Sequence, residues 1–239
     1  MTKLYYHLSE AVKIKKISDD GKAGVFHIEG LYTGFGLTLG NALRRALFSS
    51  LPGAAVTRIK IKGVGHEFTT ISGVAEDIIE LTLNLKKIRL KFFTDEPQVL
   101  TLKIKGEKEV KAGDIKTNPQ VEIVNPELHL ASLTDKKAEL EMELTVEKGL
   151  GYLSVADRKF ERLPIGTIVL DAIFSPVTRV NTSVENMRVG ERTDYNKLKI
   201  EIETDGSLTP SQAIYKTANV LKDHFDKVSV ALASEDPDA

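Results

Sequence analysis

Residues 138–149, with the sequence AELEMELTVEKG, alternate apolar and polar side chains over most of their length. Successive side chains of a strand point to opposite faces of a sheet, so the apolar residues fall on one face and the glutamates on the other. This segment therefore predicts a long strand with one buried and one solvated face, as in antiparallel sheets. The same alternation appears in VKIKKI (12–17), AGVFHIEG (23–30), VTRIKIKG (56–63), VLTLKIKG (99–106) and YNKLKIEIETDG (195–206).

Other segments have helical spacing. They cover residues 37–51, which end at Pro52-Gly53, residues 74–86, with Ser72 as a possible N-cap, and residues 210–228. The last has the strongest start signal, because Thr209 and Gln212 form a capping box. Residues 166–174, GTIVLDAIF, predict a strand buried on both faces. Strands and helices are mixed without regular βαβ alternation, so we expect an α+β fold.

The composition limits the classes of function. The 239-residue chain is 41% hydrophobic and contains no cysteine, and it has no apolar run near the roughly 20 residues that cross a bilayer. Its N-terminus lacks an export signal, so we expect a soluble cytoplasmic protein with no membrane contact and no disulfides. The 33 basic and 34 acidic residues give a formal charge of −1. No net field draws the chain to nucleic acid, so no direct DNA binding is expected.

No catalytic pattern is found in the sequence. The histidines are scattered and fit no metal-binding spacing: His7, His27, His66, His129 and His224. The glutamates 139, 141 and 143 share the solvated face of one strand, where their carboxylates are expected to stay hydrated. We therefore expect no catalytic residue, no metal and no cofactor.

Gly34, Gly36 and Gly40 surround the start of the first helical segment. Their spacing fits neither the dinucleotide-binding fingerprint nor a phosphate loop. A glycine inside a helix costs about 1 kcal/mol relative to alanine, so Gly40 indicates the close approach of another backbone, which we expect to be a facing helix. The alternative is a nucleotide-binding α+β enzyme that uses the loop from Gly34 to Gly40 at a helix N-terminus.

A helical wheel gives the first helix two different faces. One face carries cations and an aromatic ring: Asn41, Arg44, Arg45 and Phe48. The opposite face carries apolar and small side chains: Leu39, Leu43, Ala46 and Ser50. An exposed aromatic ring beside arginines is typical of a protein interface. The other interpretation is that Phe48 packs beneath a loop of its own chain.

The C-terminal helical segment has a narrow apolar seam. Its residues follow a four, three, four, three spacing: Ile214, Ala218, Leu221, Phe225 and Val228. This spacing is typical of a helix that packs along another helix at a small angle. The partner is either a helix of the same chain or a helix of a second copy.

Five segments occur in a characteristic order and spacing: GFGLTLGNALRRALFSSLPG (34–53), GVAEDIIELTLNLK (73–86), GLGYLSVADR (149–158), PIGTIVLDAIFSPV (164–177) and ERTDYNKLKIEIETDGSLTP (191–210). Together they resemble the N-terminal domain of the bacterial RNA polymerase alpha subunit family over essentially the whole chain. The resemblance implies a discontinuous dimerisation subdomain of residues 1–52 and 178–232. It also implies an inserted, mostly β subdomain of residues 53–177. Residues 233–239 are expected to be a disordered acidic tail at the start of a linker.

The resemblance also implies partners. A homodimer is expected to serve as a platform for the large beta and beta prime subunits of DNA-directed RNA polymerase, a nucleotidyltransferase complex in which this chain has no catalytic site of its own. Contacts to beta are expected at Arg44, Arg45 and Phe48, and contacts to beta prime at Lys86 and Ile173. The dimer interface is expected to use the first and last helices through Phe35, Leu39, Leu43, Ala46, Ile214, Ala218, Leu221 and Phe225.

The chain departs from the family pattern at Leu150, where many members carry an arginine. Family members also continue through a linker into a second domain that binds upstream DNA. No DNA contact is therefore assigned to this segment.

Overall fold

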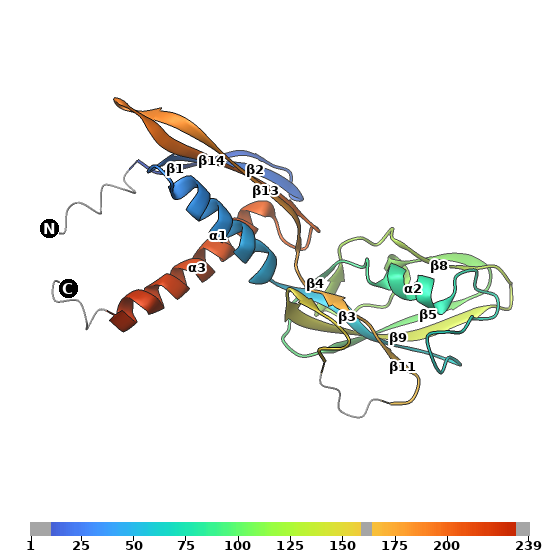
Figure 1. Cartoon of the computed structure of the whole chain (residues 1–239). Helices are drawn as coiled ribbons and strands as arrows, with labels where there is room; N and C mark the ends of the chain where they lie inside the picture. Colours follow the sequence, from blue (N-terminus) through green and yellow to red (C-terminus); the bar gives the residue numbers. More distant parts are fainter. Residues whose placement is uncertain (1–10, 159–163, 233–239) are drawn as a thin grey trace. The chain divides into compact units, whose positions relative to one another are not determined.

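The computed structural model describes residues 11–158 and 164–232. The chain divides into two compact units (Figure 1). The first combines Met1–Leu51 with Pro176–Ala239, and the second, Pro52–Ser175, is inserted between those two parts. The boundaries expected after residues 52 and 177 lie within two residues of these. The expected disordered tail lies outside the described residues.

In the first unit, the described residues form a four-stranded antiparallel sheet and two helices. The strand order is β1 (Lys13–Asp19), β2 (Ala23–Leu31), β14 (Arg192–Thr204) and β13 (Val177–Val189). Helices α1 (Phe35–Ser49) and α3 (Pro210–Leu232) cross each other on one side of this sheet (Figure 1). Apolar residues from the sheet, the helices and the loops between them form its core: Ile28, Leu31, Leu43, Leu47, Leu51, Val177, Val180, Leu198, Ile200, Ile202 and Ala213.

The second unit is mostly β structure. Its main sheet has the order β11 (Thr167–Val169), β3 (Pro52–Ile61), β9 (Glu139–Leu150) and β5 (Gln98–Lys105). Three antiparallel ladders pair β10 (Tyr152–Leu153) with β12 (Ala172–Ile173), β4 (Leu90–Phe92) with β7 (Val121–Ile123), and β6 (Lys108–Lys111) with β8 (His129–Leu133). The described residues of this unit also form helix α2 (Ile78–Leu85) and the short 3-10 helix η2 (Ala112–Asp114).

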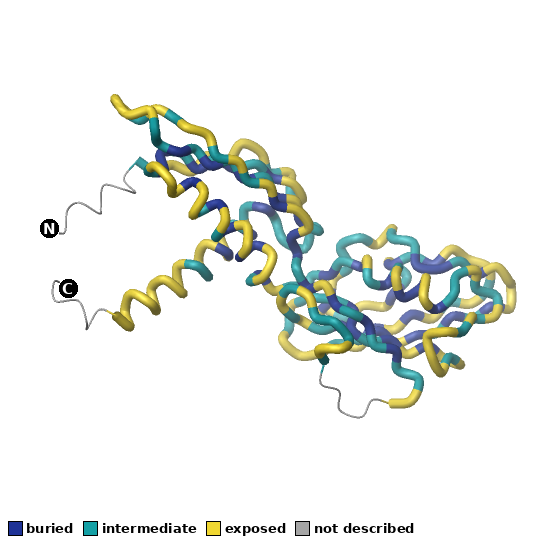
Figure 2. Tube along the Cα trace, in the orientation of Figure 1, coloured by how far each residue is buried: buried dark blue, intermediate teal, exposed yellow. Residues whose placement is uncertain are grey.

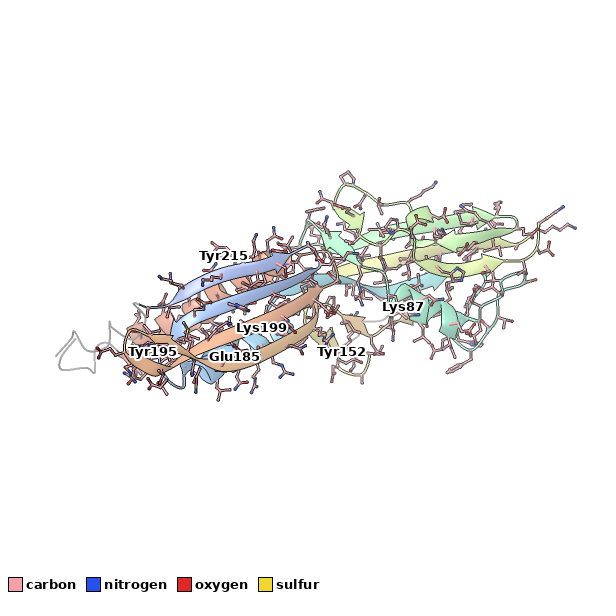
Figure 3. The ribbon with its side chains drawn as sticks, turned by 90° about the horizontal axis from the view of Figure 1, so that it is seen from above. Lys87, Tyr152, Glu185, Tyr195, Lys199 and Tyr215 are labelled. Carbon is pink, nitrogen blue, oxygen red and sulfur yellow. The ribbon has the colours of Figure 1, made fainter. Side chains whose placement is uncertain are left out.

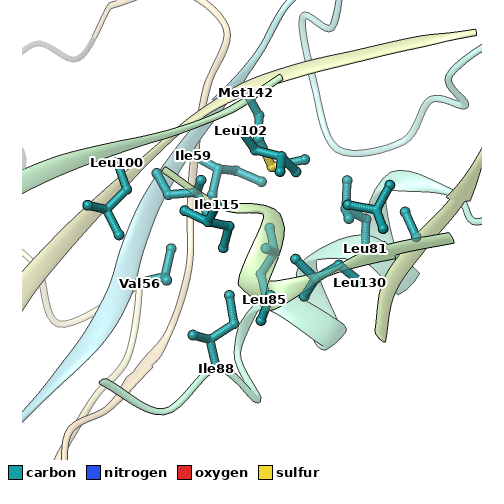
Figure 4. Close-up of a cluster of buried hydrophobic side chains, with 14 of the residues drawn as sticks. Val56, Ile59, Leu81, Leu85, Ile88, Leu100, Leu102, Ile115, Leu130 and Met142 are labelled. Atoms are coloured by element: carbon teal, nitrogen blue, oxygen red, sulfur yellow. The ribbon is translucent and has the colours of Figure 1, made fainter. Parts of the chain in front are cut away.

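The core of the second unit lies between α2 and the main sheet. Leu81 and Leu85 of α2 belong to the same buried cluster as Ile59 of β3, Leu102 of β5 and Met142 of β9 (Figure 4). Strand β9 supplies this core from one face only, because Leu140, Met142, Leu144 and Val146 are buried while the residues between them are exposed or half-buried. The alternation predicted for this strand is confirmed, and the α+β fold class with it.

Several expected elements differ in detail from the structure. Helix α2 begins at Ile78 and not near residue 74, because Asp77 caps it and accepts the N–H of Glu80 at 2.7 Å, so Ser72 is not the N-cap. Residues 166–174 form the two short strands β11 and β12. Their burial alternates, with Ile168, Leu170 and Ala172 buried, so the prediction of a strand buried on both faces was wrong.

The C-terminal helix begins as predicted and ends later. The N–H of Gln212 donates to Thr209 Oγ1 at 3.3 Å, and the N–H of Thr209 donates to Gln212 Oε1 at 3.2 Å, which confirms the capping box. The helix continues to Leu232. None of the described helices combines the length and apolar character needed to cross a membrane.

Candidate functional site

The glycine-rich segment leads into helix α1 through a left-handed turn. Gly34 is the N-cap residue, with φ of 88°, and its position offers no side chain to cap the helix. The cap comes instead from Asn196 of β14, whose Oδ1 atom accepts the N–H of Gly34 at 2.9 Å and the N–H of Gly36 at 3.3 Å. Asn196 is only 7% exposed. Such N–H groups at a helix N-terminus are suited to bind an anion, but here the N–H groups of Gly34 and Gly36 already have Asn196 as their acceptor.

Two glycines of α1 lie against the sheet. A Cβ atom on Gly36 would lie 2.7 Å from Val184 Cγ1 of β13, and one on Gly40 would lie 3.0 Å from Leu198 Cδ1 of β14. Gly40 is closely approached, but by the side chains of Leu198 and Thr182 on two strands and not by the backbone of a facing helix, as had been expected. Because the glycines admit the sheet and the cap is filled, the nucleotide-binding alternative is not favoured.

The outward face of α1 carries the side chains predicted for it. Asn41, Arg44, Arg45 and Phe48 are all exposed, and Phe48 is 36% exposed. Among the described residues, no carboxylate pairs with either guanidinium. This surface therefore offers two unneutralised cations beside an aromatic ring, which is the composition expected of a contact surface for another protein.

Helix α3 extends beyond the sheet that supports its first half. Its buried residues are Pro210, Ala213 and Thr217, and every described residue from Lys222 to Leu232 is exposed (Figure 2). This exposed half carries apolar side chains: Phe225 at 66% exposed, Val228 at 58%, Val230 at 76% and Leu232 at 54%. Water-exposed apolar residues in such a group are typical of a surface that another protein covers.

The expected dimer residues fall into three groups. Phe35, Ala218 and Phe225 are exposed, and Leu39, Ile214 and Leu221 are half-buried against the core of the first unit. Leu43 and Ala46 are 4% and 6% exposed and are packed inside their own unit. These two residues were expected in the interface because the resemblance implies the whole first helix. The structure shows that their face of α1 covers the sheet. Leu37, 64% exposed on the same helix, was not predicted.

Lys86 and Ile173 lie in one region of the second unit. Lys86 Nζ forms a 3.0 Å ion pair with Asp171 Oδ2, and Asp171 is two residues from Ile173. Ile173 is 49% exposed and lies opposite Tyr152 in the β10–β12 ladder. The N–H of Val155 and the ammonium of Lys86 hold the pKa of the Asp171 carboxyl below its ordinary value. Asp171 therefore remains charged and fixes the position of Lys86.

Asn196, Asp171 and Tyr152 were missed by the sequence reasoning. Asn196 did carry a signal, because it shares the buried face of β14 with Leu198 and Ile200, where a polar side chain is costly unless it is hydrogen-bonded. Asp171 and Tyr152 carried none, because their neighbours come from distant parts of the chain.

The titratable groups are paired with one another in ways typical of solvated surfaces. Glu141 accepts from both Lys62 and Lys103 at 3.0 Å, and these two lysines lower the pKa of its carboxyl. His129 contacts Glu76 at 2.9 Å and Glu109 at 3.2 Å. Within residues 11–158 and 164–232, no group of three or more His, Asp or Glu side chains is arranged so that it could hold a metal ion. His7 lies outside the described residues.

Comparisons with known proteins point to one family. Residues 59–175 match the model of the RNA polymerase Rpb3/RpoA insert domain. The chain is 50% identical over 210 residues to the DNA-directed RNA polymerase subunit alpha of Symbiobacterium thermophilum. The aligned region covers 88% of this chain and 66% of that relative. It is 50% identical over 214 residues to the subunit alpha of Clostridium kluyveri and 51% identical over 216 residues to that of Moorella thermoacetica, covering 90% of this chain in both cases. The matched part spans about two thirds of the length of these relatives.

Proposed function

This chain belongs to the DNA-directed RNA polymerase alpha subunit family, and from that premise we propose that it is a non-catalytic assembly subunit that pairs with a second copy of itself. The dimer serves as the platform on which the beta and beta prime subunits assemble for DNA-templated transcription. Catalysis belongs to the large subunits in this proposal. In this proposal the protein acts in the cytoplasm. No direct DNA contact is assigned to this segment, whose net charge is −1.

The exposed apolar half of α3 is the observation that carries the dimer proposal. Fully burying a side chain such as Phe or Val contributes about 1.5–3 kcal/mol, and Phe225, Val228 and Leu232 all remain more than half exposed in the single chain. Phe35 and Leu37 of α1 are also exposed apolar residues of the same unit. Pairing α1 and α3 of one copy with those of another copy would cover both groups.

The contacts to the large subunits use different units of the chain. We assign Arg44, Arg45 and Phe48 of α1 to beta, because unpaired arginines beside an aromatic ring favour a carboxylate-bearing or carbonyl-bearing partner. We assign Lys86 and Ile173 of the second unit to beta prime. The two copies of the dimer present the same surfaces. In this proposal one copy binds beta and the other copy binds beta prime.

Arg45→Ala tests the assignment to beta. Loss of an arginine at the centre of an interface costs about 2 kcal/mol or more, which is about thirtyfold in affinity. In cells that express the chain with beta and beta prime, we expect the tagged variant to remain a folded dimer and to recover little beta. Arg188→Ala, at an exposed arginine of β13, is the matched control and should recover beta normally. Full recovery of beta with Arg45→Ala contradicts the assignment.

A further inference from the structure

Three polar residues at alternate positions of β14 contact the turn that joins β2 to α1. These are Arg192, Asp194 and Asn196, which precede the buried apolar residues of the same strand. Leu31, the last residue of β2, is the ladder partner of Asn196, so the turn leaves the sheet beside this end of β14. Asn196 caps the helix. Arg192 and Asp194 contact the two residues that precede the cap residue.

Asp194 anchors the turn through the hydroxyl of Thr33. Thr33 Oγ1 lies 2.7 Å from Asp194 Oδ2 and 2.8 Å from the carbonyl oxygen of Asp194, so its proton donates to one of these two oxygens. The next residue is Gly34, with φ of 88°. The N–H of Phe35 donates to the carbonyl of Tyr32 at 3.0 Å, which closes the turn. The anchor therefore acts on the chain directly before the left-handed residue.

Arg192 holds the Asp194 carboxylate in a two-point ion pair. Its Nε donates to Oδ1 at 3.0 Å and its Nη2 donates to Oδ2 at 2.7 Å. The guanidinium also lies 5.0 Å from the ring centre of Tyr32 and 5.3 Å from that of Tyr195, which lies near the tip of the β13–β14 hairpin (Figure 3). Arg192 first, and the Thr33 hydroxyl second, hold the pKa of the Asp194 carboxyl well below its ordinary value. A two-point pair between planar groups fixes orientation as well as distance.

The turn determines where Phe35 points. Phe35 is the first residue of α1 and is 48% exposed, and only Gly34 separates it from Thr33. Glycine allows the backbone more conformations than any other residue, so a turn without an anchor would have to be ordered when a partner buries Phe35. Association costs less free energy when a contact residue is already held in its bound position.

We propose that Arg192 and Asp194 are positioning residues for the dimer: they hold the turn at Thr33 so that Phe35 is already in place when a second copy of this chain covers it. This inference rests on the proposed function, because the use of Phe35 by a second copy belongs to that proposal. Arg192 and Asp194 need not touch the second copy themselves. Their effect on dimerisation passes through Phe35.

The test measures two properties of the full chain and its variants. Hydrogen–deuterium exchange of peptides that cover residues 32–40 reports the turn, and sedimentation velocity over a dilution series gives the dimer dissociation constant. Asp194→Ala and Thr33→Val are each expected to speed exchange in these peptides and to raise the dissociation constant by at least about fivefold. Thr33→Ser keeps the hydroxyl and is expected to behave as the native chain does. Glu185→Ala removes an exposed carboxylate that pairs with Lys197 on the same sheet, and as the control it should change neither property.

A double-mutant cycle with Phe35→Ala separates positioning from a general loss of stability. In the Phe35→Ala background, Asp194→Ala is expected to raise the dissociation constant by less than about twofold, because the residue through which it acts is gone. Circular dichroism is recorded for each variant, and Thr33→Val carries the test if Asp194→Ala does not fold.

The outcomes separate this inference from the proposed function. Folded variants with unchanged exchange in residues 32–40 overturn the inference, whatever the oligomeric state. Faster exchange with an unchanged dissociation constant also overturns it, as does an equal effect of Asp194→Ala with and without Phe35. A monomeric native chain, or a Phe35→Ala variant that dimerises as tightly as the native chain, contradicts the proposed function itself, and the inference fails with it. That failure is recognised without any change at Asp194.

Discussion

Asn196 connects the sheet of the first unit to the start of helix α1. Its Oδ1 atom accepts two helix N–H groups, and its Nδ2 atom donates to Asn186 Oδ1 at 3.4 Å. The cap is needed because Gly34 has no side chain and because Gly36 must stay small to admit Val184. The glycines and Asn196 therefore together fix the position of α1 on the sheet. That position leaves the face with Arg45 and Phe48 exposed.

Asn196→Ala is expected to lower the free energy of unfolding by about 1–3 kcal/mol, because two N–H groups at the helix start lose their acceptor and the N–H of Gly36 is buried. Urea unfolding followed by circular dichroism measures this. Asn219→Ala, at an exposed asparagine of α3, should change the stability by less than about 0.5 kcal/mol. Equal stability of the two variants would show that Asn196 does not cap the helix.

Asp171 is expected to make the stability of the second unit depend on pH in the acidic range. Its pKa lies below the ordinary value of 3.8 because of the Val155 N–H and Lys86. A carboxyl with a lowered pKa in the folded state contributes stability above pH 3.8, and that contribution is lost as the pH falls through the folded pKa. Asp171→Asn should therefore be less stable than the native chain at about pH 6, and the difference should shrink below pH 3.8.

Urea midpoints measured for both chains across that pH range test the expectation. Glu67→Gln removes an exposed carboxylate of the same unit and serves as the control. A difference between Asp171→Asn and the native chain that is the same at all pH values would contradict the assigned ion pair.

At the scale of elements, helix α3 shows which structural features a local sequence pattern can predict. The capping box at Thr209 and Gln212 predicted where it starts, because that signal uses only neighbouring residues. The seam of apolar residues predicted a helical partner, and Ile214 and Leu221 do pack against the core of their own unit. The seam alone could not distinguish that half from the half that remains exposed, since the supporting sheet comes from distant strands.

Phe225→Glu is expected to convert the dimer to a monomer at micromolar concentration, because the change places a charge in the interface proposed for α3. The secondary structure should persist, since Phe225 is 66% exposed in the single chain. Sedimentation velocity and circular dichroism measure both properties. Lys222→Glu, at an exposed polar position of the same helix, is the control. A Phe225→Glu variant that remains dimeric contradicts the proposed use of α3.

At the scale of the whole molecule, alternation predicted most strands of both units, because antiparallel strands with one wet face carry that pattern locally. The positions that depend on long-range contacts were less predictable. Residues 166–174 form two short strands paired with β3 and β10, and nothing local in their sequence marks the break at Leu170 and Asp171. Leu43 and Ala46 were assigned to the dimer interface because the resemblance implies the whole first helix, and the sequence does not show that the sheet covers their face of that helix.

The most direct test is the mass of the purified chain in solution, measured by multi-angle light scattering at micromolar concentration. The account depends on two copies covering the exposed apolar residues of α1 and α3, and it predicts twice the 26.4 kDa mass of one chain. A stable species of 26.4 kDa would contradict it.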